Sequence, residues 1–355
     1  MSGGVDSSVA AAELLAAGHA VVGATMKLWG GPSDSGCCSV ADVEDARAVA
    51  DRLGIAHHVF NFTEDFDRQV VAPYVVDHAA GRTPNPCVAC NRHLKFDRFL
   101  QRADQLGFDA VATGHHARVG RRPDGRWSLR RGADPAKDQS YVLHMLGQDE
   151  LARLLLPVGE LGKAEVRRRA AAAGLRTAGK PDSQDVCFVP RAGGRREFLS
   201  GRIPLHPAVL VDRTGTAVGT TDAVELVTVG QRRGLNHPGG AAAGSRRYAI
   251  SVDVEGGVVV VGGPEDLQVD RLDVSDACWV VGAPCPDERL EVQTSAHGRP
   301  VPGRWAPPGA VALEEPIRRV AAGQSVVLYR GDEVVGGGTA AAGLPPAPGT
   351  VAPPR

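Results

Sequence analysis

Apolar and polar positions in the first half of the chain alternate between short runs typical of buried strands and longer stretches with helical periodicity. Three apolar runs predict strands, at residues 20–25, 56–60 and 110–113. Between them, Ser39 can cap a helix that runs to about Leu53, and a second helix is predicted from Arg92 to Leu106, closed by Gly107. Strand and helix in this order predict right-handed crossovers and an α/β fold with a doubly wound parallel sheet, which binds ligands at the carboxyl ends of its strands.

The pattern changes in the second half of the chain. Helical stretches are predicted at residues 148–156 and 163–173, and short β-rich runs follow at 208–211, 247–252, 258–261 and from about 290 to 335. We therefore predict four parts: a domain at 1–200, a small β-rich central domain at 203–265, a second β-rich domain at 266–343, and a proline-rich tail at 344–355.

Composition excludes some classes of protein. The formal net charge of -1 gives no global basic field, so a nucleic-acid partner would have to bind a local basic face. No run is long and apolar enough to span a membrane, and no leader is recognisable, so we expect a cytoplasmic protein. Seven cysteines in a chain of 355 residues indicate catalysis or metal binding rather than a disulfide scaffold.

The chain opens on a glycine- and serine-rich run that begins a predicted helix: Ser2, Gly3, Gly4, Val5, Asp6, Ser7 and Ser8. Glycines at a helix start let the backbone approach a phosphate closely, and the unpaired N–H groups favour the anion. Asp6 can hold the Mg²⁺ that accompanies a nucleotide. The run lacks the Gly-Lys-Ser ending of kinase-like loops. An ordinary Gly-Ser turn that caps a helix is the structural alternative.

Two cysteine motifs have spacings typical of catalysis. Cys87 and Cys90 follow two prolines that predict an extended loop before a helix at Arg92, so the helix dipole lowers the pKa of the Cys90 thiol. Cys187 lies in a loop that also holds Lys180, which favours a thiolate. A structural zinc site is the alternative, but zinc usually takes four ligands and a second Cys-x-x-C pair is missing. The remaining cysteines are expected to be mostly structural: Cys37, Cys38, Cys278 and Cys285.

The phosphate loop resembles that of the N-type ATP pyrophosphatases, which split ATP between its α- and β-phosphates and adenylate a carbonyl oxygen. With both cysteine motifs, nearly the whole chain resembles the tRNA-specific 2-thiouridylases of that superfamily. Further motifs in the family's order lie at residues 26–27, 112–116, 137–141, 157–161, 230–235 and 323–325. The resemblance implies a PP-loop catalytic domain with a helical tRNA-contacting extension over residues 1–200, and a β-barrel as the last domain.

The resemblance also implies a role for each matching residue. ATP would be bound by the residues from Ser2 to Ser8, by Met26 and by Gly114. The target base would be met by Asn85, Pro86 and Cys87, and the rest of the tRNA by His115, Lys137, Asp138, Gln139 and Gln324. Cys187 would carry a persulfide, and Cys90 would be its partner.

The implied activity is ATP-dependent 2-thiolation of the wobble uridine of tRNA. Adenylation of O2 makes AMP the leaving group, and the persulfide sulfur, supplied by a cysteine desulfurase or a sulfur-relay protein, then replaces the oxygen. One alternative is a [4Fe–4S] cluster held by Cys87, Cys90 and Cys187. Another is a catalytically inactive tRNA-binding protein. Arg167, Arg168 and Arg169 could face RNA phosphates, although such a run is as often a solvated helix face.

The sequence departs from the family pattern in three places. It begins at the phosphate loop, without the strand that should precede it, so two neighbouring strands would have unpaired edges and a chain extended upstream should be more stable. Thr221 stands where many relatives have a histidine. Ser295 and Ala296 stand where some relatives have an Arg-Tyr pair that reaches the RNA, which puts RNA binding by the last domain in question.

Overall fold

The N-terminal part of the chain is an α/β unit. The computed structural model describes residues 1–29, 39–182, 186–190, 192–235 and 246–342. Helix α1 (Val5–Ala16) is followed by β1 (Gly23–Lys27), α2 (Val40–Leu53) and β2 (His57–Asn61), and the two strands pair in parallel. Ser39 and Asp42 form the capping box that starts α2, so this predicted helix is confirmed. Strand β1 lies two to three residues later in the chain than the predicted run at 20–25, whereas β2 matches the run at 56–60 to within one residue.

A second parallel pair completes the strands of this unit. Strand β3 (Val111–Ala112) pairs with β6 (Leu154–Leu155), and helices α7 (Gln148–Ala152) and α8 (Lys163–Ala172) flank β6 in the chain. The helix predicted over residues 148–156 is therefore wrong in its second half. Helix α7 ends at Ala152 because Leu154 and Leu155 form hydrogen bonds with strand β3 instead, and the Leu154 side chain is buried there.

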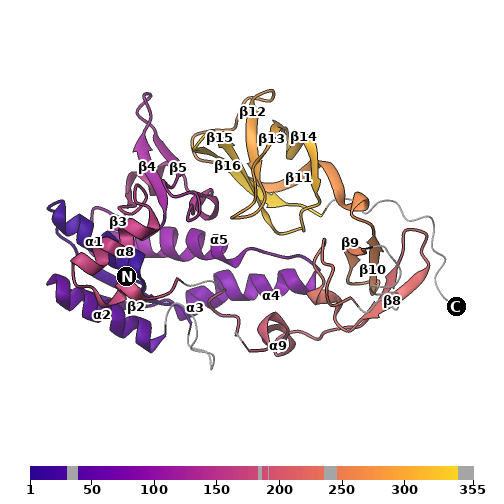
Figure 1. Cartoon of the computed structure of the whole chain (residues 1–355), viewed down its shortest axis with the longest axis horizontal. Helices are drawn as coiled ribbons and strands as arrows, with labels where there is room; N and C mark the ends of the chain where they lie inside the picture. Colours follow the sequence, from indigo (N-terminus) through magenta and orange to yellow (C-terminus); the bar gives the residue numbers. More distant parts are fainter. Residues whose placement is uncertain (30–38, 183–185, 191, 236–245, 343–355) are drawn as a thin grey trace.

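Two long helical segments extend from this unit toward the other domains (Figure 1). The first joins α3 (Thr63–Phe66), the π-helical η1 (Asp67–Val71) and α4 (Ala72–Ala79); the second joins α5 (Pro86–Cys90), the π-helical η2 (Asn91–Arg98) and α6 (Phe99–Gln105). The predicted helix start at Arg92 is wrong. The helix begins at Pro86, because the Asn85 side chain accepts a hydrogen bond from the Cys87 amide at 3.1 Å and proline suits the first helical position.

The central β-rich part follows three short helices, η3 (Ser140–Leu143), η4 (Arg176–Gly179) and α9 (Gly194–Ser200). Its four strands are β7 (Ala208–Val211), β8 (Ala217–Thr221), β9 (Tyr248–Asp253) and β10 (Val258–Gly262), in the order β8-β7-β10-β9. The turn η5 (Val224–Leu226) joins this sheet to α4 and α9. The strand runs predicted at 208–211, 247–252 and 258–261 thus match the structure to within one residue.

The last part is a closed barrel. After η7 (Glu265–Leu267), strands β11 (Gln268–Trp279), β12 (Arg289–Gln293), β13 (Val301–Ala306), β14 (Ala310–Arg318), β15 (Ser325–Arg330) and β16 (Glu333–Ala340) pair in the order β11-β14-β13-β12-β15-β16. Pairing of β11 with β16 closes the ring around a core that includes Trp305 and Leu328. The hairpin β4 (Ala117–Arg121) and β5 (Trp127–Arg131), which the sequence did not predict, meets β16 and joins the barrel to the α/β unit (Figure 1).

Among the described helices, none is long and apolar enough to cross a membrane. The proline-rich tail predicted at 344–355 lies outside the described residues.

Candidate active site

The phosphate loop is a compact turn at the start of α1. Gly4 caps the helix, and its carbonyl accepts hydrogen bonds from the hydroxyls of Ser8 at 2.8 Å and Ser7 at 3.2 Å. Gly3 has φ +68°, and a Cβ there would lie 2.3 Å from the carbonyl oxygen of Asp42. The loop therefore requires glycine both for its backbone conformation and for its contact with α2, and it presents the helix N-terminus that suits a phosphate.

Gly114 packs directly on this loop from the carboxyl end of β3. A Cβ at Gly114 would lie 2.5 Å from the Ser7 nitrogen and 2.6 Å from the Asp6 carbonyl carbon. Met26, the other residue outside the loop that was expected to contact ATP, lies half-buried on β1. The structure thus brings the predicted ATP residues to one end of the parallel strands, where α/β folds bind ligands.

Replacing Gly114 by alanine is expected to weaken ATP binding by about 10-fold or more, because the added methyl group displaces the phosphate-loop backbone. Equilibrium binding of ATP measures this. Gly179→Ala is the matched control, since a Cβ at Gly179 meets no atom within 4 Å and its backbone suits alanine. Equal ATP affinity of the two variants would contradict the assignment.

Asp6 lies between two basic side chains. Its carboxylate accepts hydrogen bonds from Lys163 Nζ at 2.7 and 2.8 Å and contacts His116 Nε2 at 3.1 Å. Burial raises the pKa of Asp6, but the bonds from His116 and Lys163 outweigh it, so the pKa lies below its ordinary value. Asp6 is therefore an anion at neutral pH, as a ligand of nucleotide-bound Mg²⁺ must be.

Asp182 links the phosphate loop to the part of the chain that leads to Cys187, which we call the Cys187 segment. Its carboxylate contacts Lys163 Nζ at 2.8 Å, Lys137 Nζ at 2.8 Å and Arg167 at 2.9 Å. Burial raises the pKa of Asp182, but the bonds from Lys137 and Lys163 bring it down to about 2. Lys163 thus bridges Asp6 and Asp182, and we name these three residues and Lys137 the ionic junction.

The ionic junction predicts a stability effect with a definite sign. An aspartate has a pKa near 3.9 when unfolded, so a folded pKa of about 2 means that Asp182 stabilises the protein above about pH 4 and loses this contribution as the pH falls toward 2. Asp182→Asn should lower the melting temperature at pH 7, and the gap from the wild type should shrink between pH 4 and 2. Melting curves across this range measure the gap; one that stays constant with pH would exclude the interpretation.

Cys90 and Cys187 meet in one apolar cluster although they lie far apart in the sequence. Cys90 is 9% exposed on α5, inside a core with Leu94 and Phe188, and the half-buried Cys187 packs against the same core. Cys87 is exposed on the first turn of α5. Because a helix dipole falls off within the first turn, Cys87 feels it more than Cys90, which differs from the sequence-based expectation.

A metal centre at the three thiols finds no support in the described part of the chain. Within the described residues, which include Cys87, Cys90 and Cys187, no three His, Cys, Asp or Glu side chains gather to hold a metal ion. The same finding gives no support to a zinc site there. Cys37 and Cys38 lie outside the described residues, and Cys278 accepts a hydrogen bond from Arg92 at 3.4 Å, which suits a structural role.

Comparison with known proteins matches these features. Residues 1–191 match the family described as "tRNA methyl transferase HUP domain", and residues 269–340 match the "Aminomethyltransferase beta-barrel domain". A protein of Chloroflexus aurantiacus named tRNA-specific 2-thiouridylase MnmA is 48% identical over 354 residues, covering 95% of this chain and 96% of its own. The chain belongs to the tRNA-specific 2-thiouridylase family.

Two further members of the 2-thiouridylase family agree. The proteins of that name from Cutibacterium acnes and Mycobacteroides abscessus are 45% identical over 347 residues and 46% over 350. They cover 96% and 95% of this chain, and 94% and 96% of their own. The predicted fold, an α/β domain followed by β-rich parts that end in a β-barrel, is therefore confirmed.

Residues 83–87 include those expected to meet the target base, and we call them the base-contacting loop. Side chains from two other domains hold this loop in place. The Gln324 side chain of the barrel donates to the Thr83 carbonyl, and the Thr83 hydroxyl lies 3.2 Å from that of Thr228 in the central part. Asn85 then caps α5 and Pro86 is buried, which leaves Cys87 exposed. Gln324 therefore positions this loop, a role that the sequence did not suggest.

The residues expected to contact tRNA differ in exposure. Gln139 is exposed, while its side-chain oxygen accepts from the His116 amide at 2.9 Å, and Lys137 is half-buried in the ionic junction. Asp138 is buried and accepts from Arg131, Gly132 and Ser140, so the structure gives its carboxylate a positioning role rather than a surface for RNA.

His115 is also buried rather than presented to RNA. It is 8% exposed and contacts the Thr113 hydroxyl at 2.8 Å. Burial, with smaller effects from Lys95 and His116, holds the pKa of His115 well below its ordinary value, so the ring is neutral at pH 7. A neutral, buried ring suits a packing role at the end of β3.

Basic residues near Cys187 also have partners that the sequence did not predict. Lys180 binds Asp42 at 2.7 Å and Asp45 at 2.6 Å on α2, so it does not provide the free ammonium expected to activate Cys187. Arg167 donates to the carbonyls of residues 178 and 180 and to Asp182, which ties α8 to the Cys187 segment. Arg168 and Arg169 pair with carboxylates of Glu165 and Glu13. The structure therefore gives these arginines structural partners.

Sequence reasoning missed three residues of the site: His116, Lys163 and Asp182. Each lies within or beside a recognised motif, but nothing in the sequence shows that they meet at Asp6. Lys163 offered one signal, since a lysine is unexpected in the first turn of a helix, where the dipole favours acidic side chains.

Proposed function

We propose that this protein catalyses ATP-dependent 2-thiolation of the wobble uridine of tRNA. The observation that carries the proposal is the position of Cys187: it shares an apolar core with Cys90, and the segment before it is bound through Asp182 and Lys163 to Asp6 of the phosphate loop. A nucleotide site and two cysteines linked in this way can catalyse adenylation and sulfur transfer in one active site. The names of the relatives support the same reaction.

ATP first activates the base. The uridine O2 attacks the α-phosphorus, pyrophosphate leaves, and O2 becomes part of an AMP leaving group. The α1 N-terminus would hold the phosphates, while Asp6 would hold Mg²⁺ and Lys163 would face the charge that develops on the leaving pyrophosphate.

Sulfur then replaces the activated oxygen. The terminal sulfur of a Cys187 persulfide attacks C2, and AMP leaves with the former O2. The Cys90 thiolate attacks the inner sulfur of Cys187, the S–S bond to the product breaks, and its electron pair stays on the transferred sulfur. The resulting Cys90–Cys187 disulfide requires an external thiol reductant. In a second route Cys90 first releases hydrosulfide, which attacks C2 itself.

The sulfur donor in this proposal is a protein that delivers persulfide sulfur, such as a cysteine desulfurase or a sulfur-relay protein. A [4Fe–4S] cluster held by Cys87, Cys90 and Cys187 is the alternative route, and it has no support from the described residues, where no three His, Cys, Asp or Glu side chains gather to hold a metal ion. The inactive tRNA-binding protein remains the competing function, and it predicts tRNA binding without ATP cleavage.

The first step has its own test. With unmodified tRNA present, ATP should be cleaved to AMP and pyrophosphate, and omission of tRNA should reduce the release of pyrophosphate to background. The cysteine variants should still release pyrophosphate in a first turnover, since adenylation precedes sulfur transfer. Tight tRNA binding with no pyrophosphate release would favour the inactive binding protein.

A further inference from the structure

A small basic hollow lies beside the clamped base-contacting loop. It has a volume of about 260 Å³ and is lined by Arg195 and Arg196 of α9, by Thr221, Gln231 and Gly234, and by the apolar side chains of Ala223, Leu226 and Val227. No carboxylate is among the described residues that line it. Two guanidinium groups without an acidic neighbour in the lining suit an anion.

Arg195 is held in place in this hollow. Its guanidinium donates to the Leu226 carbonyl at 2.8 Å and reaches the Thr228 hydroxyl at 3.5 Å. These two bonds leave N–H groups of the guanidinium available for a ligand. Arg196 is exposed, and the next turn of the central part adds Arg232 and Arg233, which are also exposed. Within the described residues no carboxylate forms an ion pair with Arg195, Arg196, Arg232 or Arg233.

The hollow is connected to both parts of the proposed active site. Thr228, which Arg195 contacts, is also the residue that touches Thr83, and the chain from Thr83 to Cys87 can span at most about 14 Å. On the other side, Phe198 and Leu199 anchor α9 in the core that contains Cys90. A nucleotide next to the target base would therefore have its backbone within reach of Arg195 and Arg196.

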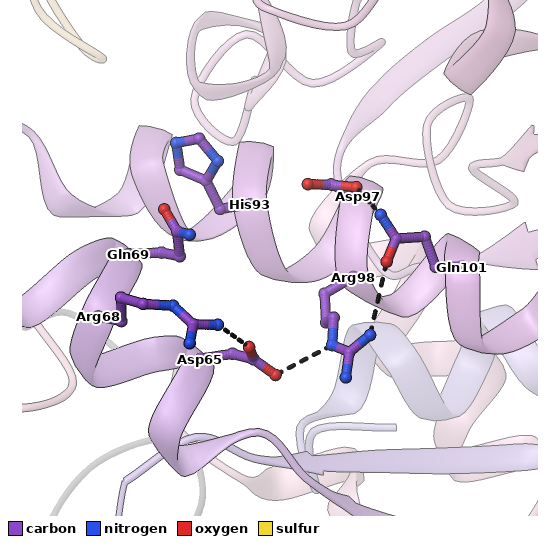
Figure 2. A pocket seen from close by; sticks show the side chains of 7 residues that line it. All are labelled: Asp65, Arg68, Gln69, His93, Asp97, Arg98 and Gln101. Atoms are coloured by element: carbon purple, nitrogen blue, oxygen red, sulfur yellow. Dashed lines mark hydrogen bonds and ion pairs between the residues drawn. The ribbon is translucent and has the colours of Figure 1, made fainter.

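A second hollow differs from this one in the ion pairing of its arginines. The larger hollow between η1 and η2, about 370 Å³, also contains two arginines, Arg68 and Arg98 (Figure 2). There, however, both bind the carboxylate of Asp65, and Asp97 lies on the same wall. Its positive charge is compensated within the protein, so it offers little to an anion.

We infer that the Arg195–Arg196 hollow binds a backbone phosphate of the tRNA that flanks the target uridine. The inference rests on the proposed function for the identity of the RNA. It adds a phosphate subsite on α9 and the central part, a region with no RNA-contacting residue expected from the sequence. Because phosphate contacts carry little sequence information, this subsite positions the anticodon loop rather than selecting its sequence.

The test compares the affinity of an unmodified anticodon stem-loop RNA for the wild type and for Arg196→Gln, at several salt concentrations. Arg196 is exposed, so its replacement should leave the melting temperature unchanged. We expect affinity to fall about 10-fold and the slope of log affinity against log salt to lose up to about one unit. Arg68→Gln, a matched loss of one arginine in the larger hollow, should change neither value.

Each outcome is decisive. Unchanged affinity and slope for Arg196→Gln would overturn the inference, and so would a loss of ATP affinity with RNA binding intact, because the hollow would then serve the nucleotide. If the wild type itself fails to bind the RNA, the proposed function fails and the inference with it. Since the assay measures binding, it separates the subsite from any fault in sulfur transfer.

Discussion

Replacing Lys163 by methionine is expected to slow ATP-dependent thiolation by about 100-fold or more. The Lys163 side chain is only 12% exposed and neutralises two carboxylates, Asp6 and Asp182. Without it, His116 is the one basic partner that Asp6 keeps among the described residues, and the charge proposed to develop on pyrophosphate loses this ammonium group. Asp182 retains Lys137 and Arg167, so the Cys187 segment should remain attached to α8.

The Lys163 measurement separates kcat from the KM for ATP. Lys163→Arg should recover part of kcat, because arginine keeps the positive charge. Recovery should be incomplete, because the planar guanidinium does not reproduce the compact ammonium group. Lys27→Met removes an exposed lysine at the end of β1 and should leave both constants near their wild-type values. A Lys163→Met enzyme with unchanged kcat would show that the ionic junction only stabilises the fold.

Replacing Cys187 by serine is expected to abolish 2-thiouridine formation, with a loss of at least about 1,000-fold. A serine hydroxyl cannot carry a persulfide, whereas its similar size should preserve the packing against the apolar core around Cys90. The variant should therefore bind tRNA and melt like the wild type, and it should still release pyrophosphate in a first turnover. Cys278→Ser is the matched control, a half-buried thiol of the barrel outside this core.

Cys90 decides between the two sulfur-transfer routes. If Cys90 attacks the inner sulfur after transfer, Cys90→Ser should leave tRNA joined to Cys187 through a disulfide that a thiol reductant releases. If Cys90 instead releases hydrosulfide first, the joined species should not form, and added sulfide should restore product. A Cys187→Ser enzyme with normal activity would contradict both routes.

Much of the fold follows from local signals in the sequence. The Ser39–Asp42 capping box starts α2 where a cap was expected, and the helix ends at Leu53 as predicted, followed by Gly54 in the left-handed conformation. Strands β7 and β10 follow apolar runs bounded by turn residues, so their positions agree closely with the sequence. These elements are set by residues adjacent in the chain, which is why the sequence alone places them.

Elements that depend on distant partners were not predictable. Leu154 and Leu155 continue a helical pattern but pair with β3, so the end of α7 depends on a strand far away in the chain. The start of α5 is a different case, because its signal is local: Asn85 caps the helix and Pro86 takes its first position. The site shows the same limit as the end of α7. The sequence identified the phosphate loop and both cysteines, but the meeting of Lys163, Asp182 and Asp6 arises only when α1, α8 and the Cys187 segment pack together.

ATP-dependent sulfur transfer through Cys187 can be measured as 2-thiouridine in tRNA by nucleoside mass spectrometry. The protein would be incubated anaerobically with unmodified tRNA, Mg-ATP and a persulfide donor, without free sulfide, alongside Cys187→Ser and Cys278→Ser. The proposed reaction predicts 2-thiouridine that requires ATP, persists with Cys278→Ser and disappears with Cys187→Ser. Absence of 2-thiouridine from the wild type while tRNA remains bound, or its formation without ATP, would contradict it.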